Sequence, residues 1–168
     1  MVRCLVLSAV VATQLAAQQP SPPAHDSSLH RQHTQNDSAF AQVQRRGQNV
    51  MGVDQYTSRH VFQPLPEGGR IELQREVEDS AGVAQIRRHL SDVAAQFAQG
   101  DFSAPFLVHD QQVPGTAVMR AKRTVISYEM RPLPRGGEIR ITTRDREAVQ
   151  AVHAFLAFQR SDHRAGAH

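Results

Sequence analysis

The sequence predicts an α+β fold, in which two β-β-α repeats form a four-stranded antiparallel sheet covered on one face by two helices. Three observations lead to this prediction: a repeated motif, a change of hydrophobic period after each copy, and acceptor side chains where the helices should begin. The motif is Pro-Leu-Pro-x-Gly-Gly-x-Ile, which starts at Pro64 and again at Pro132, an offset of 68 residues. Self-similarity at a fixed offset is typical of a domain built from repeated units.

Each copy of the motif is expected to form the turn of a β-hairpin. Extended segments precede it at residues 60–63 and 124–131, and its paired glycines permit the backbone conformations that tight turns need. In the strand that follows, apolar residues alternate with charged ones, at Ile71 in the first copy and at Ile139 and Ile141 in the second. This alternation indicates one buried and one solvated face of a sheet.

After each hairpin the hydrophobic period changes from 2 to about 3.6, which predicts an amphipathic helix. Asp79 and Asp145 stand where these helices should begin and can accept hydrogen bonds from the first turn. Between the two units we predict a loop over residues 100–110 and a short helix that opens near Pro114. The apolar stripes of the two long helices are Ile86, Leu90, Val93, Ala94 and Phe97, and Val149, Val152 and Leu156.

The N-terminal region is expected to lie outside the folded domain. Residues 1–17 are predicted to be a secretory signal peptide, because one basic residue is followed by an apolar run too short to span a bilayer and then by small and polar residues. Residues 18–46, rich in His, Gln, Pro and Ser, are predicted to form a disordered leader. Residues 47–165 are expected to form a single repeat-built α+β domain.

A signal peptide predicts an exported protein, periplasmic or extracellular, with no stable membrane insertion after cleavage. The single cysteine, Cys4, lies in the predicted signal peptide, so the mature chain can form no disulfide, thiolate metal site or cysteine nucleophile. The chain has 19 basic and 16 acidic residues, a net charge of +3 with neutral His. Because this excess is small and dispersed, we expect no nucleic-acid partner.

Three motifs of the predicted domain are distinctive as a set. They are Gly100-Asp-Phe-Ser-Ala-Pro105, Val113-Pro-Gly115 and Val152-His-Ala-Phe-Leu-Ala-Phe-Gln159. Together they resemble motifs of a group of small exported bacterial proteins of uncharacterised function, over about residues 51–163. The resemblance implies a His-rich leader and paired histidines at the first strand, of which His60 is present here.

Some chains of this group carry the label aspartate carbamoyltransferase, which the sequence does not support. That enzyme family needs two α/β domains and a Ser-Thr-Arg-Thr phosphate-binding stretch. The chain is too short for two such domains, and Thr142-Thr-Arg-Asp145 reproduces the stretch only superficially.

Histidines are the candidate functional side chains of the domain. In the repeat alignment His60 takes the position of Tyr128, and it shares a strand face with Phe62, so its ring is expected on the covered face. His89 and His153 border the apolar stripes of the two helices and are expected to face one another. We therefore predict that His60, His89 and His153 converge on a Cu²⁺, Zn²⁺ or Ni²⁺ ion, which imidazole suits. Secondary candidates for metal ligands are His109 and His163.

A structural role for these histidines is the alternative, because no His-x-His or His-x3-His spacing marks a metal site. Catalysis is not favoured, since Ser103 has neither the spacing of a nucleophile elbow nor an identified base. We expect a non-enzymatic protein. Two functions stay open: metal binding or metal handling through histidines, and a structural or interaction module without a metal, which self-associates or binds a protein partner.

Overall fold

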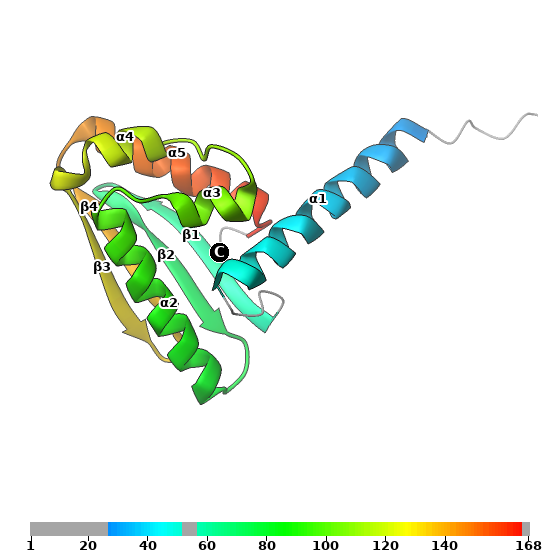
Figure 1. The fold of residues 1–168 in the computed structure, drawn as a ribbon, viewed down its shortest axis with the longest axis horizontal. Helices are drawn as coiled ribbons and strands as arrows, with labels where there is room; N and C mark the ends of the chain where they lie inside the picture. Colours follow the sequence, from blue (N-terminus) through cyan, green and yellow to red (C-terminus); the bar gives the residue numbers. More distant parts are fainter. Residues whose placement is uncertain (1–26, 52–56, 166–168) are drawn as a thin grey trace, which may run out of the picture.

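The computed structural model describes residues 27–51 and 57–165, and places helices against one face of a four-stranded sheet (Figure 1). All three strand pairings are antiparallel, so the predicted α+β fold with one antiparallel sheet is confirmed. The elements are α1 (Ser27–Met51), β1 (Ser58–Leu65), β2 (Gly68–Arg75), α2 (Ser80–Ala98), α3 (Ser103–His109), α4 (Thr116–Ala121), a short 3-10 helix (Arg123–Val125), β3 (Ile126–Leu133), β4 (Gly136–Thr143) and α5 (Arg146–Asp162).

The order of strands in the sheet is β1-β2-β4-β3, which places the second strand of each hairpin at the centre. The two hairpins have the same pairing register when their residues are matched at an offset of 68. In the central pair, Ile71 lies opposite Ile139, and these two residues are equivalent by that offset. An approximate twofold axis therefore passes through the sheet between the two isoleucines.

The two long helices are exchanged between the hairpins. α2 follows the first hairpin but packs on β3 and β4, whereas α5 follows the second and packs on β1 and β2. Arg87 of α2 donates hydrogen bonds to the backbone oxygens of Leu133 (2.7 Å) and Gly136 (2.9 Å), and His153 of α5 is 2.9 Å from the backbone oxygen of Leu65. Because Leu65 and Leu133 are equivalent, the two helices bind equivalent ends of the opposite hairpins.

Both helices begin at the aspartates that the sequence indicates. Asp79 and Asp145 are N-caps, and each accepts a hydrogen bond of 3.0 Å from the backbone N–H three residues further on. Such caps stabilise a helix by roughly 1 kcal/mol. The caps lie 66 residues apart, because the connection before α5 is shorter than that before α2. Leu90 and Leu156 are thereby equivalent in the two helices, and both are buried.

The first glycine of each motif is required by the close approach of the two central strands. A Cβ on Gly136 would lie 2.0 Å from the backbone oxygen of Leu73 on β2. A Cβ on Gly68 would lie 2.4 Å from the backbone oxygen of Ile141 on β4, and its φ of +141° also favours glycine. The motif therefore determines the packing at the centre of the sheet as well as the hairpin turns.

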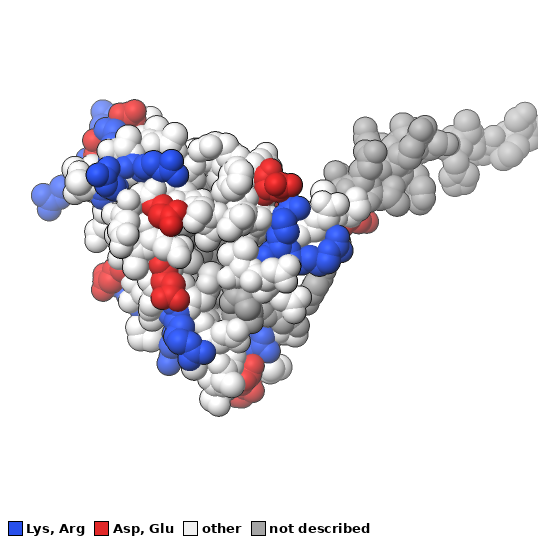
Figure 2. Space-filling model, in the orientation of Figure 1, with Lys and Arg blue, Asp and Glu red and all other residues white. Residues whose placement is uncertain are grey.

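Charged side chains are paired or interspersed on the two faces. On the sheet face away from the helices, Arg70 lies 3.2 Å from Glu72 and 3.4 Å from Glu138, and Arg59 lies 3.4 Å from Glu72. On the helix side, basic and acidic side chains are interspersed around a largely uncharged centre (Figure 2). The view in Figure 2 thus shows no broad field of one sign among the described residues.

The structure differs from the predicted disordered leader over residues 27–46, which form most of α1. α1 packs on α3, where Arg46 Nε donates a hydrogen bond of 2.7 Å to the backbone oxygen of Val108. The Arg164 guanidinium lies 4.5 Å from the centre of the Phe40 ring. These contacts come from residues far along the chain, so the polar composition of the segment does not reveal them.

The predicted loop over residues 100–110 also contains a helix, α3. Asp101 accepts a hydrogen bond of 2.9 Å from the backbone N–H of Ser103 at its start. Pro105 lies in the first turn, where a missing N–H removes no helix hydrogen bond. The short helix predicted near Pro114 is observed as α4.

The predicted signal peptide, residues 1–17, and the first part of the predicted leader, residues 18–26, lie outside the described residues. Within the part of the chain that the structure does describe, none of the helices is both long and apolar enough to cross a membrane.

Replacing Gly136 by Ala should lower the free energy of unfolding by roughly 1–3 kcal/mol, because a Cβ at this position overlaps the backbone of the neighbouring strand. Gly137→Ala is the matched control: its Cβ would have its nearest neighbours at 3.1 Å, so a smaller loss is expected. Urea unfolding followed by circular dichroism measures both. Equal losses would show that β2 and β4 do not approach each other closely at Gly136.

Candidate functional site

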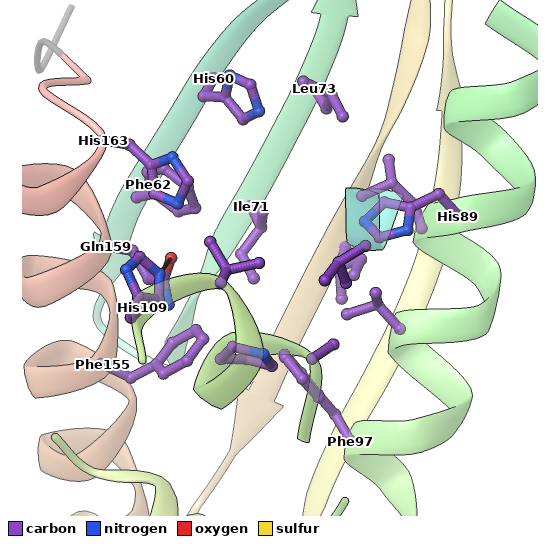
Figure 3. A pocket seen from close by; sticks show the side chains of 17 residues that line it. His60, Phe62, Ile71, Leu73, His89, Phe97, His109, Phe155, Gln159 and His163 are labelled. Atoms are coloured by element: carbon purple, nitrogen blue, oxygen red, sulfur yellow. Dashed lines mark hydrogen bonds between the residues drawn. The ribbon is translucent and has the colours of Figure 1, made fainter. Parts of the chain in front are cut away.

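An apolar pocket of about 80 Å³ lies on the helix-covered face, over the centre of the sheet (Figure 3). Ile71 and Ile139 of the central strands line it, and α2 and α5 lie on opposite sides of it in Figure 3. Residues of α3 and Val50 near the end of α1 complete the lining. The pocket forms here because α2 lies over one hairpin and α5 over the other. The approximate twofold axis of the sheet therefore passes between the two helices.

The pocket has an apolar end and a histidine-rich end. Phe97, Ile139 and Phe155 are almost completely buried, with exposed fractions of 1%, 0% and 1%. His60 and His89, by contrast, keep part of their surface exposed. Figure 3 shows His60 and His89 on opposite sides at one end, and Phe97 and Phe155 towards the other.

Imidazole and phenyl rings pack together between β1, α3 and the end of α5. The ring of His163 stacks on that of His60, with centroids 5.6 Å apart and an interplanar angle of 14°, and on that of Phe62 at 5.4 Å. It meets the ring of His109 edge-on, at 5.0 Å. His109, His163 and His60 therefore form one continuous group of rings, all of which line the pocket.

His109 is held by hydrogen bonds at both ring nitrogens. Its Nδ1 contacts the carboxylate of Asp162, and its Nε2 lies 3.0 Å from the side-chain amide oxygen of Gln159. Asp162 and Gln159 both belong to α5, so the two hydrogen bonds tie the end of α3 to that helix. His109 is thus a fixed part of the pocket wall.

Two imidazole nitrogens, by contrast, are buried without a hydrogen-bond partner: His60 Nε2 and His163 Nδ1. Burial lowers the pKa of His60 to about 4, although a hydrogen bond to the Ser58 backbone acts in the opposite direction. Burial, reinforced by the repulsion that His60 and His109 exert on His163 when they are protonated, lowers the pKa of His163 to about 3. Burial also lowers the pKa of His89. The rings of His60 and His163 are therefore neutral at pH 7.

The structure does not bring His153 to this site, so the predicted convergence of His60, His89 and His153 is wrong. His153 binds the backbone of Leu65, which lies five residues along β1 from His60. At about 3.3 Å per residue, Leu65 lies roughly 16 Å from His60 along the strand, and His153 contacts β1 at that far end. The pocket instead gathers His60 and His89 with the two secondary candidates, His109 and His163.

The arrangement of these rings does not match a metal centre. Within residues 27–51 and 57–165, no group of three or more His, Cys, Asp or Glu side chains is placed to hold a metal ion. An imidazole binds a metal through a lone pair in the plane of its ring, at about 2.0–2.1 Å. The nearly parallel, stacked rings of His60 and His163 cannot direct such lone pairs to one ion, and both nitrogens of His109 are in use.

The approximate twofold axis divides the core into two halves. One half has phenylalanine and tyrosine at positions where the other half, which contains the histidine-rich end of the pocket, has histidines. His60 is equivalent to Tyr128 by the strand offset of 68, and His163 is equivalent to Phe97 by the helix offset of 66. Phe97 and Tyr128 also contact each other, with ring centroids 5.7 Å apart. The repeat alignment identifies the first equivalence, whereas the second depends on the different lengths of the connections before the two helices.

The described residues that line the pocket include no Ser, Thr, Cys, Lys or Tyr, and hence no common nucleophile besides histidine. They also include no Asp, Glu or Arg, so the pocket offers no counter-ion for a charged ligand. No known protein family, curated protein or solved structure matches the chain.

The free energy of unfolding should fall as the pH is lowered from 7 to 5. Histidines of the unfolded chain titrate near pH 6.5, whereas His60 and His163 stay neutral in the fold down to about pH 4 and about pH 3. The unfolded state therefore binds more protons below pH 6.5, and each group removes up to about 1.4 kcal/mol of stability per pH unit. Urea unfolding across this range measures the slope.

His60→Phe and His163→Phe should each make this pH dependence weaker, because each removes one buried neutral imidazole. Carboxylates titrate mostly below this range, so the comparison between pH 7 and pH 5 isolates the histidines. An unchanged slope in both variants would contradict the burial of neutral rings.

Proposed function

We propose that this chain is an exported, non-catalytic binding protein whose pocket over the sheet centre holds a small, largely apolar ligand. The observation that carries the proposal is the pair His60 and His163, which occupies the position of Tyr128 and Phe97 in the other half of the core. We take the two β-β-α units as internal repeats, which the equal register of the hairpins supports.

Packing alone does not explain the two histidines. Phe97 and Tyr128 show that larger aromatic rings can fill the equivalent positions of this fold. A buried polar atom without a partner costs about 1–3 kcal/mol, and this half of the core contains two, His60 Nε2 and His163 Nδ1. Unpartnered polar groups in a pocket are satisfied when a ligand binds, so a binding function accounts for this cost.

Binding is favoured over catalysis because the pocket lining is mostly apolar and the imidazole of His109 has both nitrogens engaged in hydrogen bonds. Binding of an organic ligand is favoured over metal handling because neighbouring imidazoles stack instead of converging. Export is proposed from residues 1–17. Mass spectrometry of the protein recovered outside the cytoplasm should find a mature N-terminus near residue 18.

Xenon, a purely apolar probe, should bind the mature protein in this pocket and shift the NMR resonances of Ile71, Ile139 and their neighbours. Ala104→Leu should abolish these shifts, because Ala104 lines the pocket and a leucine would fill it. Ala157→Leu is the matched control, since Ala157 is exposed on α5, and it should bind xenon like the wild type.

No xenon effect in the wild type, or equal effects in both variants, would contradict the proposed pocket function. A saturable response of the same resonances to Zn²⁺, Cu²⁺ or Ni²⁺, lost in His60→Phe, would instead favour the predicted metal function.

A further inference from the structure

The two edge strands of the sheet, β1 and β3, differ in how their free edges are covered. At the β1 edge, the Arg160 guanidinium of α5 donates a hydrogen bond of 3.1 Å to the backbone oxygen of Phe62. By the helix offset of 66, the residue of α2 equivalent to Arg160 is Ala94, whose methyl side chain cannot donate. The twofold-related edge, that of β3, therefore lacks this cover.

No other described segment takes the place of this cover at β3. Apart from the pairing with β4, none of the described residues forms a hydrogen bond with the backbone of residues 127–132. Figure 1 shows β3 at the side of the molecule remote from α1. A free edge of eight residues presents backbone groups to which another strand can add.

The backbone groups at this edge belong to Tyr128, Met130 and Pro132. In an antiparallel strand, each residue directs its N–H and C=O to the same side, and successive residues alternate between the two sides. Pro132 has no N–H, so its position is one that points away from β4, and Met130 and Tyr128 share its alternation. The other hairpin agrees, because the oxygen of Phe62, the counterpart of Met130, is the one that reaches Arg160.

The side chains of β3 make this edge complementary to itself. On the sheet face away from the helices, Glu129 and Arg131 lie 2.7 Å apart and expose 60% and 49% of their side-chain surface. In a twofold antiparallel pairing that places Met130 opposite Met130 of a second copy, each Glu129 lies opposite an Arg131 of the other copy. Opposite charges at directly opposed positions of two strands attract. The four charges then alternate in sign around the axis.

Other registers lose this complementarity. A shift by two residues in one direction places the two Glu129 side chains opposite each other, and a shift in the other direction does the same for Arg131. Like charges directly opposite are destabilising. A shift by one residue would pair side chains that point to opposite faces of the sheet. The sequence of β3 therefore specifies one register with a second copy.

We propose that β3 is the interface of a homodimer, in which two copies of the chain join their sheets into one continuous antiparallel sheet. The two Met130 residues exchange backbone hydrogen bonds at the axis, and each Tyr128 N–H donates to the Pro132 oxygen of the other copy. Pro132 ends the ladder on each side, because it has no N–H to offer. β3 contributes no residue to the pocket lining, so this inference does not depend on the proposed binding function.

Sedimentation equilibrium of the mature protein should show a mass that rises with concentration towards twice that of the monomer. Glu129→Arg and Arg131→Glu should each weaken the dimer roughly tenfold or more, because two pairs of opposite charges become pairs of like charge. An equimolar mixture of the two variants should dimerise again, since one chain then carries two arginines at these positions and the other two glutamates.

Glu78→Arg is the matched control. It makes the same change of charge at an exposed position between β2 and α2, and should dimerise like the wild type.

Amide hydrogen exchange tests the same interface without any substitution. The N–H groups of Tyr128 and Met130 face solvent in the monomer and should exchange more slowly as the protein concentration rises. Those of Glu129 and Arg131 point to β4 and should change much less.

A wild type that stays monomeric at all concentrations would overturn the proposal, and so would a dimer that neither single variant weakens. A dimer that both variants weaken but their mixture does not restore would refute the register about Met130. Exchange at Tyr128 and Met130 that does not depend on concentration, in a protein that does dimerise, would place the interface elsewhere.

Discussion

The close approach of β2 and β4 at their glycines is the contact on which the rest of the structure depends. It places Ile71 opposite Ile139 on the approximate twofold axis and brings the two hairpins into one sheet. The leucines of the exchanged helices then sit against the second glycine of each opposite motif, Leu156 at Gly69 and Leu90 at Gly137. Because each of the two helices lies over one hairpin, a pocket forms between the helices, over the approximate twofold axis.

The approximate symmetry makes the departure from it informative. One half of the core is closed by carbocyclic rings, and the other half has His60 and His163 at the same positions. Imidazole rings stack as phenyl rings do, yet each brings a nitrogen that burial deprives of water. We infer that the unpaired nitrogens lower the stability of this end of the core and are present because they provide a polar contact for a ligand.

Local sequence signals predict the hairpins, the helix caps and the sheet well, because alternation, glycine pairs and Asp79 or Asp145 act over a few residues. They predict α1 and α3 poorly, because α1 depends on distant contacts such as that of Arg46 with Val108. The site is predictable in part, since strand alternation places His60 correctly. The exchange of helices, which sends His153 to the hairpin end and brings His163 to the pocket, is a tertiary feature without a local signal.

The double variant His60→Phe/His163→Phe tests most directly whether the imidazoles are present for binding and not for stability. It makes this half of the core chemically similar to the half that contains Phe97. We predict that its free energy of unfolding at pH 7 rises by about 1–3 kcal/mol, because the gain from removing two unpaired polar atoms is partly offset by the larger size of the phenyl rings. A variant that is less stable than the wild type would contradict the binding role and would show that the imidazoles are structural.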